Sequence, residues 1–211
     1  MTHPPTFPLR QDLRRIADLV TAGSRVLDIG CGDGALLAYL VAEKQVIGRG
    51  LELSPAGVHD SVSRGLSVIQ GDADQDLADY PDLAFDFVIL SRTLQAMRQP
   101  LDVLRHLVRI GQRAIVSIPN FGLWHIRLKI ALDGRMPTTG LLPDAWHDTP
   151  NIHLCTIRDL VETCRGDGIV IEDALILNPA ARALPYRFDG ALANLLGAQG
   201  VFILRRDRRA A

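Results

Sequence analysis

A short apolar segment that ends in closely spaced glycines is the feature of this chain that most restricts its fold. Residues 26–34 are Val-Leu-Asp-Ile-Gly-Cys-Gly-Asp-Gly, and a helical pattern follows at residues 35–42. Glycine leaves no side chain between the backbone and a ligand. A strand that ends in such a turn before a helix brings bare backbone N–H groups towards a nucleotide-type cofactor. The segment therefore predicts an α/β chain built around a cofactor loop.

Composition and charge exclude several classes of protein. The chain has 211 residues, of which 47% are hydrophobic and 22% charged, and this predicts a single domain over residues 1–211. A formal net charge of −1 argues against a nucleic-acid partner recognised by a basic surface. No segment approaches the roughly 18 apolar residues of a membrane span, so we expect a cytoplasmic protein without a membrane partner. The three cysteines form no CxxC pair and indicate neither a disulfide framework nor a metal site.

Strand and helix patterns alternate through the first half of the chain. Such alternation predicts a parallel sheet covered by helices on both faces. Ser54 precedes a proline and is a plausible N-cap for one of the helices. The predicted strands are residues 25–29, 45–51, 67–70, 85–91 and 113–118, and the predicted helices are residues 10–20, 35–42, 55–64 and 100–110.

The alternation changes after the fifth strand. Residues 120–150 form an insert that contains both tryptophans, and a helix at residues 157–165 follows it. Strands at residues 169–177 and 200–204 are expected to pair antiparallel at the sheet edge, which makes seven strands in total. Residues 178–199 between them are long enough to cover part of a site.

Three carboxylates at successive strand ends discriminate between two possible cofactors. Residues 30–35 satisfy the G-x-G-x-x-G/A pattern of dinucleotide loops. Asp28 would repel a pyrophosphate, but it would attract the cationic amino-acid portion of S-adenosylmethionine. Glu52 can accept both ribose hydroxyls, and Asp72 with the N–H of Ala73 can meet the adenine. Each acid alone could be an exposed strand-end residue, and the three together favour S-adenosylmethionine.

The remaining members of the predicted cofactor site surround these acids. Leu53 is expected to pack on the adenine face, while Ser91 and Gln95, just past the fourth strand, are secondary contacts for cofactor or acceptor. Cys31 could be redox-active beside backbone donors, or it could simply be small enough to fit the loop. The predicted cofactor-binding residues are Asp28, Gly30, Cys31, Gly32, Gly34, Glu52, Leu53, Asp72, Ala73, Ser91 and Gln95.

This pattern of acids resembles the class I S-adenosylmethionine-dependent methyltransferases. The segment 85–91 with Asp86 also resembles the fourth motif of that superfamily, and the resemblance covers nearly the whole chain. It implies a Rossmann-like, mostly parallel seven-stranded sheet with helices on both faces and an antiparallel edge strand. The ligand that it implies is S-adenosylmethionine or S-adenosylhomocysteine.

Four further segments are similar to the methionine-biosynthesis protein W (MetW) family. The longest, residues 148–159, is Asp-Thr-Pro-Asn-Ile-His-Leu-Cys-Thr-Ile-Arg-Asp, and the others are residues 27–34, 93–97 and 119–122. This resemblance implies a protein of bacterial methionine synthesis that binds S-adenosylmethionine. It also implies support or regulation of a partner enzyme, homoserine O-acyltransferase.

No recognisable catalytic signature accompanies the cofactor loop. Residues 118–121, Ile-Pro-Asn-Phe, depart from the Asn/Asp-Pro-Pro-Tyr/Phe motif of amino-methylating enzymes. His125, His147 and His153 could act as bases or could be packing residues. A methyltransferase acting on an unknown small molecule under the insert is therefore an alternative function, and a nicotinamide-dependent enzyme is a third.

Overall fold

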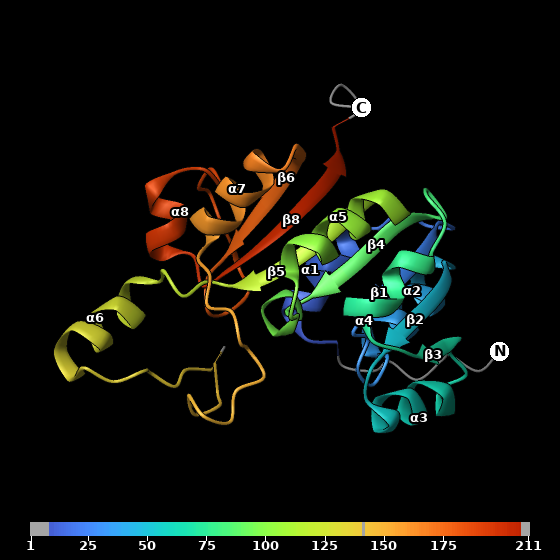
Figure 1. Ribbon diagram of the computed structural model, residues 1–211, viewed down its shortest axis with the longest axis horizontal. Helices are drawn as coiled ribbons and strands as arrows, with labels where there is room; N and C mark the ends of the chain where they lie inside the picture. The colour runs from blue at the N-terminus through green and yellow to red at the C-terminus, as the bar shows by residue number, and fades with distance from the viewer. Residues whose placement is uncertain (1–8, 141, 208–211) are drawn as a thin grey trace.

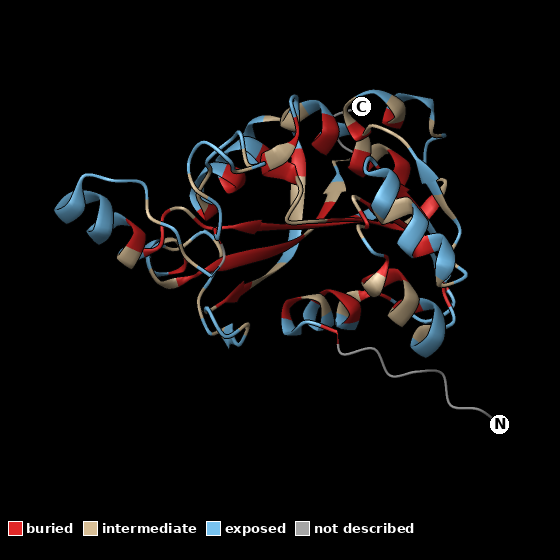
Figure 2. Ribbon diagram, turned by 90° about the horizontal axis from the view of Figure 1, so that it is seen from below, coloured by how far each residue is buried: buried red, intermediate tan, exposed pale blue. Residues whose placement is uncertain are grey.

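An eight-stranded sheet lies at the centre of the structure, with helices on both faces (Figures 1 and 2). The structure is a computed structural model that describes residues 9–140 and 142–207. In the order in which they lie in the sheet, the strands are β3 (Val68–Gln70), β2 (Ile47–Glu52), β1 (Arg25–Ile29), β4 (Phe85–Ser91), β5 (Gly111–Pro119), β8 (Gln199–Arg206), β6 (Ile169–Leu177) and β7 (Ala183–Leu184).

The helices alternate with the strands in the first half of the chain, as the sequence predicts. Ser54 caps its helix as expected, because its side chain accepts a hydrogen bond from the N–H of Gly57 at 3.5 Å. The helices are α1 (Gln11–Leu19), α2 (Ala35–Lys44), α3 (Pro55–Ser63), α4 (Ala73–Asp76), α5 (Pro100–Ile110), α6 (Trp124–Asp133), α7 (Ile157–Gly166) and α8 (Ala191–Leu196), with 3-10 turns η1 (Leu77–Asp79) and η2 (Leu94–Ala96).

The direction of the strands confirms the predicted sheet, except for its strand count. The first five strands run parallel, and β8 pairs antiparallel with both β5 and β6. The expectation of seven strands is wrong, because Ala183 and Leu184 form an additional short strand paired with the end of β6. Two residues are too few to show an alternating pattern, so β7 could not be predicted from its residues.

Strand β4 is buried on both faces, and its residues are apolar at nearly every position, which is typical of a central parallel strand. Phe87 and Ile89 pack in the cluster that contains residues of α1 and α2, while Val88 and Leu90 pack in the cluster with α5 and α7. Figure 2 shows the buried strands between the helical layers. Because parallel strands end at the same edge, the loops that follow β1, β2, β3 and β4 meet there.

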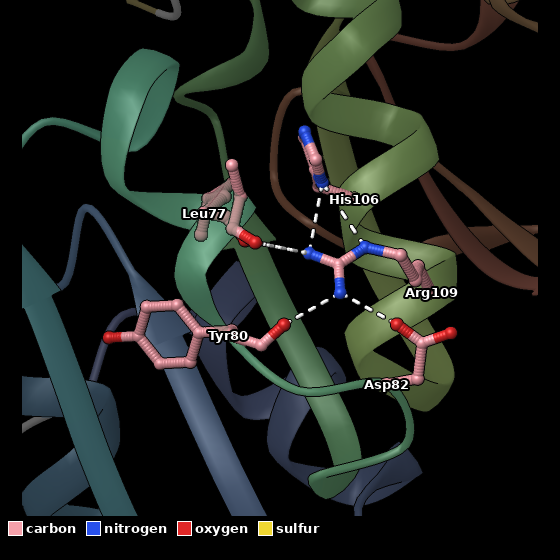
Figure 3. A network of polar contacts seen from close by, with 6 residues as sticks. Leu77, Tyr80, Asp82, His106 and Arg109 are labelled. Atoms are coloured by element: carbon pink, nitrogen blue, oxygen red, sulfur yellow. Dashed lines mark hydrogen bonds and ion pairs between the residues drawn. The ribbon is translucent and has the colours of Figure 1, made fainter.

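Arg109 fixes the connection between α4 and β4 (Figure 3). Its guanidinium donates to the carbonyl oxygens of Leu77 at 2.8 Å and Tyr80 at 2.6 Å, and to the Asp82 carboxylate at 2.7 Å. Burial lowers the pKa of His106, and the charge of Arg109 lowers it further, so the imidazole is neutral and can accept from the guanidinium. One side chain of α5 thus holds the segment that follows the predicted adenine-binding residues.

Replacing Arg109 by methionine is expected to lower the free energy of unfolding by about 2–4 kcal/mol, because two partly buried carbonyls lose a charged donor. Urea denaturation followed by circular dichroism measures the change. Arg113→Met is the control, since Arg113 is exposed and pairs with Glu172 on the surface; its loss should stay below about 1 kcal/mol. Equal losses in the two variants would contradict an anchoring role for Arg109.

Candidate cofactor site

The loop between β1 and α2 contains three glycines. At two of them, a side chain would collide with a neighbouring residue, and at the third the space around the Cα atom is empty. Gly30, Gly32 and Gly34 have φ values of +65°, +57° and +74°. A Cβ atom on Gly30 would lie 2.9 Å from Thr93, and one on Gly34 would lie 2.5 Å from Leu66. A Cβ on Gly32 would meet no atom within 4 Å. Gly32 therefore leaves open space at the point where the loop turns towards the strand ends.

The expectation that this loop presents a row of bare N–H groups is wrong. The N–H of Gly30 donates to Leu51 O at 2.7 Å, that of Gly32 to the Glu52 carboxylate at 2.8 Å, and that of Gly34 to Cys31 O at 2.9 Å. A pyrophosphate needs such donors, so their use inside the protein disfavours a dinucleotide. The glycine pattern in the sequence could not show these bonds, because they depend on where β2 and its terminal carboxylate lie.

Two buried carboxylates meet at the ends of β1 and β2. Asp28 is 3% exposed and accepts no hydrogen bond from any part of the chain that the structure describes. Burial raises the pKa of Asp28 to about 7, and the negative charge of Glu52 contributes to the increase. Glu52 is 9% exposed and accepts from the N–H groups of Gly32 and Ser54, both at 2.8 Å. An uncompensated buried carboxylate is costly, so this pair suits a ligand that brings positive charge and hydroxyl donors.

Cys31 lies inside the loop as a protonated thiol. Burial raises its pKa to about 12, and the charge of Asp28 contributes to the increase. The thiolate is the reactive form of cysteine, so this environment disfavours the redox alternative and supports the interpretation of Cys31 as a small residue that fits the loop.

The predicted adenine contacts lie at the ends of β2 and β3. Asp72 caps α4, where it accepts from the Asp74 N–H at 3.0 Å and from the Gln75 amide at 3.0 Å. Each carboxylate oxygen keeps further acceptor capacity. The N–H of Ala73 donates to no atom within the described residues, and Leu53 is 63% exposed beside Glu52. Asp72 and the Ala73 N–H thus offer polar contacts to an adenine ring, and Leu53 offers an apolar one.

The structure places Ser91 and Gln95 against protein groups. The Ser91 hydroxyl lies 3.2 Å from that of Ser117. Gln95 is 1% exposed, and its amide nitrogen donates to Pro119 O at 3.2 Å and to the Cys155 sulfur at 3.1 Å. These bonds link the end of β5 to the segment before α7. A cofactor contact from either side chain stays a prediction.

Asn120 has a structural role. The departure of residues 118–121 from the motif of amino-methylating enzymes does not indicate this role. It is 1% exposed, and its amide nitrogen donates to Asn194 O at 2.9 Å and Gly197 O at 2.7 Å. Its amide oxygen accepts from the N–H groups of Gly122 at 2.8 Å and Ile157 at 3.2 Å. All four hydrogen bonds are used to hold the start of the insert against α7 and α8, so this side chain has no capacity left for a substrate.

Neither Asp86 nor the cavity beside it belongs to this site. Asp86 lies at the amino-terminal end of β4, opposite the glycine loop, and its carboxylate pairs with Arg25 at 3.0 Å. A cavity of about 710 Å³ opens at the same end of the sheet, and Ser24 and Gln112 line it. Arg25 lowers the pKa of Asp86, and Glu172 pairs with Arg113 and Arg205, so both acids that line the cavity within the described residues have a basic partner.

No candidate base is held near the carboxylate pair by a contact within the described residues. His147 and His153 are exposed, and His125 packs edge-on against Trp124 at 5.7 Å.

Within residues 9–140 and 142–207, no helix has the length and apolar character needed to cross a membrane.

Comparisons with known proteins identify a matching family and a relative of this chain. The family model described as methionine biosynthesis protein MetW matches residues 10–204. A bifunctional methionine biosynthesis protein MetXA/MetW of Rhodopirellula baltica is 34% identical over an alignment of 184 residues that covers 82% of this chain. The chain spans only 30% of the length of that relative.

Solved structures of S-adenosylmethionine-dependent methyltransferases share the fold. The enzyme from Mesorhizobium loti superposes with a TM-score of 0.64 at 19% identity, covering 92% of this chain and 95% of the other. The protein from Thermotoga maritima superposes with a TM-score of 0.63 at 19% identity, covering 93% and 87%. These similarities confirm the class I methyltransferase-type fold that the sequence predicts.

Proposed function

This chain belongs to the methionine biosynthesis protein MetW family, and from that membership we propose that it binds S-adenosylmethionine, or S-adenosylhomocysteine, and supports or regulates homoserine O-acyltransferase. The observation that carries the cofactor half is the buried pair of Asp28 and Glu52, which forms no ion pair with a basic side chain of the residues that the structure describes. A ligand with a cationic amino-acid end and a ribose satisfies both carboxylates.

Each residue around the pair binds a different part of the ligand. Asp28 holds the ammonium group, Glu52 accepts from the ribose hydroxyls, and Asp72 with the Ala73 N–H takes the adenine edge. Leu53 covers the adenine face. When bound, S-adenosylmethionine supplies an activated methyl group, whereas the residues described here supply binding and orientation.

The partner half of the proposal rests on an exposed apolar surface and on the relative from Rhodopirellula baltica. That relative carries MetXA and MetW in one chain, and we take its MetXA part as the homoserine O-acyltransferase. Joining two partners in one chain raises their effective concentration for each other. We propose that the same two parts associate here as separate chains.

The insert provides a surface for this association, and we call its residues 121–140 and 142–150 the arm. Figure 1 shows α6 projecting beyond the sheet, at the end opposite to α3. Trp124, Leu128 and Leu132 follow one another at intervals of one helical turn and are 49%, 47% and 74% exposed. Trp146 is 75% exposed. Clustered exposed apolar side chains of this kind mark protein interfaces, and tryptophan is enriched at their centres.

Two measurements test the proposal separately. Calorimetric titration with S-adenosylmethionine, S-adenosylhomocysteine and NAD should show binding of the first two alone; binding of NAD alone would overturn the cofactor half. Acyl transfer by purified homoserine O-acyltransferase should change when this chain is added. An unchanged rate together with failure to co-purify would overturn the partner half.

Leu128→Asp is expected to weaken association with the acyltransferase at least about tenfold, because a charge would be buried in an apolar interface. Val62→Asp is the matched control, since Val62 is 52% exposed on α3. Biolayer interferometry with immobilised acyltransferase measures both variants. The same loss in both would show that the arm is not the docking surface.

A further inference from the structure

A second cavity lies at the same edge of the sheet as the glycine loop, next to the first turn of α1. Its volume is about 370 Å³, and three arginines from separate parts of the chain line it. Arg10 precedes α1, Arg92 follows β4, and Arg182 lies just before β7. Neither Asp28 nor Glu52 lines this cavity.

Positive charge predominates in this cavity. Of the lining residues that the structure describes, Asp12 alone is acidic, and both of its carboxylate oxygens accept from Arg10, at 3.2 and 3.0 Å. Burial lowers the pKa of Arg92, the charge of Arg10 lowers it further, and Asp12 opposes this change. The side chain of Arg182 makes no hydrogen bond or ion pair with any residue that the structure describes. An anion would reduce the repulsion between these guanidinium groups.

Gln199 provides an independent indication of a ligand. It opens β8 and lines the cavity, it is 2% exposed, and its amide nitrogen has no hydrogen-bond partner in the described part of the chain. Buried donors are almost always satisfied, so an unpaired amide beside several arginines indicates an acceptor from outside the protein. An oxyanion meets this requirement, and guanidinium groups bind carboxylates and phosphates through paired hydrogen bonds.

The walls of the cavity are held in place by hydrogen bonds. Arg92 has a left-handed backbone with φ +59°, and its N–H donates to Ser117 O at 2.9 Å and to Ser117 Oγ at 3.1 Å. Asn178 Oδ1 accepts from the N–H groups of Ala180 and Arg182, both at 3.0 Å. This preorganisation lowers the entropic cost of binding.

We propose that this cavity binds a small organic anion through its carboxylate or phosphate group, with Arg92, Arg182 and Gln199 as its donors. The site is separate from the cofactor residues and does not depend on binding of S-adenosylmethionine. It is also adjacent to them, since Thr93 follows Arg92 and lies against Gly30. An anion bound here would therefore lie next to the cofactor loop.

Titration of the full chain at constant ionic strength tests the proposal, with succinate and inorganic phosphate as probes and neutral succinamide as the control. Saturable binding of succinate or phosphate but not of succinamide is expected, and the tighter probe identifies the anionic group. Arg182→Gln should weaken binding at least tenfold, whereas Arg187→Gln should not, because Arg187 pairs with Asp189 outside the cavity. Failure of both anions to saturate, or equal weakening by the two variants, would overturn the proposal.

Gln199→Leu distinguishes a ligand-binding amide from a structural one. Leucine removes a donor that has no partner, so the variant should keep or raise the melting temperature while it weakens anion binding. A lower melting temperature with unchanged anion binding would assign Gln199 to the core instead. Asp72→Ala should keep its affinity for the anion, because Asp72 follows β3, which lies three strands away from β4 in the sheet; this variant separates failure of this site from failure of the cofactor site.

Discussion

Glu52→Ala is expected to lower the affinity for S-adenosylmethionine at least about a hundredfold, because each lost hydrogen bond to a carboxylate contributes about 1.5–3 kcal/mol. The proposed ribose contacts account for two such bonds. The carboxylate also holds the loop, since it accepts from the N–H groups of Gly32 and Ser54 at 2.8 Å each. Its removal therefore loses both ligand contacts and the shape of the site.

Calorimetric titration measures this effect, and Asp60→Ala is the matched control. Asp60 is an exposed acid on α3, so its loss should leave the affinity within about twofold of the original value if only long-range screening changes. Glu52→Gln keeps one acceptor oxygen but turns an amide group towards a backbone N–H, and it should give an intermediate affinity. Full affinity in Glu52→Ala would mean that the carboxylate serves the loop alone.

The sheet could be predicted from the sequence because its signals are local. The continuous apolar segment of β4 indicates burial on both faces, and the helix at Pro100–Ile110 has the predicted bounds. Elements with few residues could not be predicted, because they carry too little local signal. Helices α4 and α8 and strand β7 span two to six residues, which is too short for a hydrophobic period.

Some features of the candidate site could likewise be predicted from the sequence, and others could not. The positions of Asp28, Glu52 and Asp72 follow from strand order, since each comes at the end of a neighbouring parallel strand. The hydrogen bonds from Gly30 and Gly32 to β2 do not follow from it, because they join residues about 20 positions apart whose geometry only the fold sets. Gln199 was likewise invisible in the sequence, because nothing local shows that its amide is buried without a partner.

Asp28 makes the affinity for S-adenosylmethionine depend on pH. Its pKa of about 7 in the folded chain lies above the value of about 3.9 for an unfolded carboxyl. Folding therefore favours the protonated form, and ionisation destabilises the free protein increasingly as pH rises from about 4 to about 7, by at most about 4 kcal/mol. A bound ammonium group stabilises the carboxylate, so binding below pH 7 must release a proton.

The affinity should accordingly rise by up to about tenfold for each pH unit between about pH 5 and pH 7, and then level off. Titration in two buffers with different heats of ionisation measures the released proton directly. Asp28→Asn should bind weakly, without this slope, and at pH 8 it should unfold at a higher temperature than the original chain, because the buried charge is gone. Asp33→Asn is the control, as Asp33 is exposed on the same loop and pairs with Arg64 at 2.8 Å. The same slope in Asp28→Asn would assign the titration to another group and remove the ammonium contact from the site.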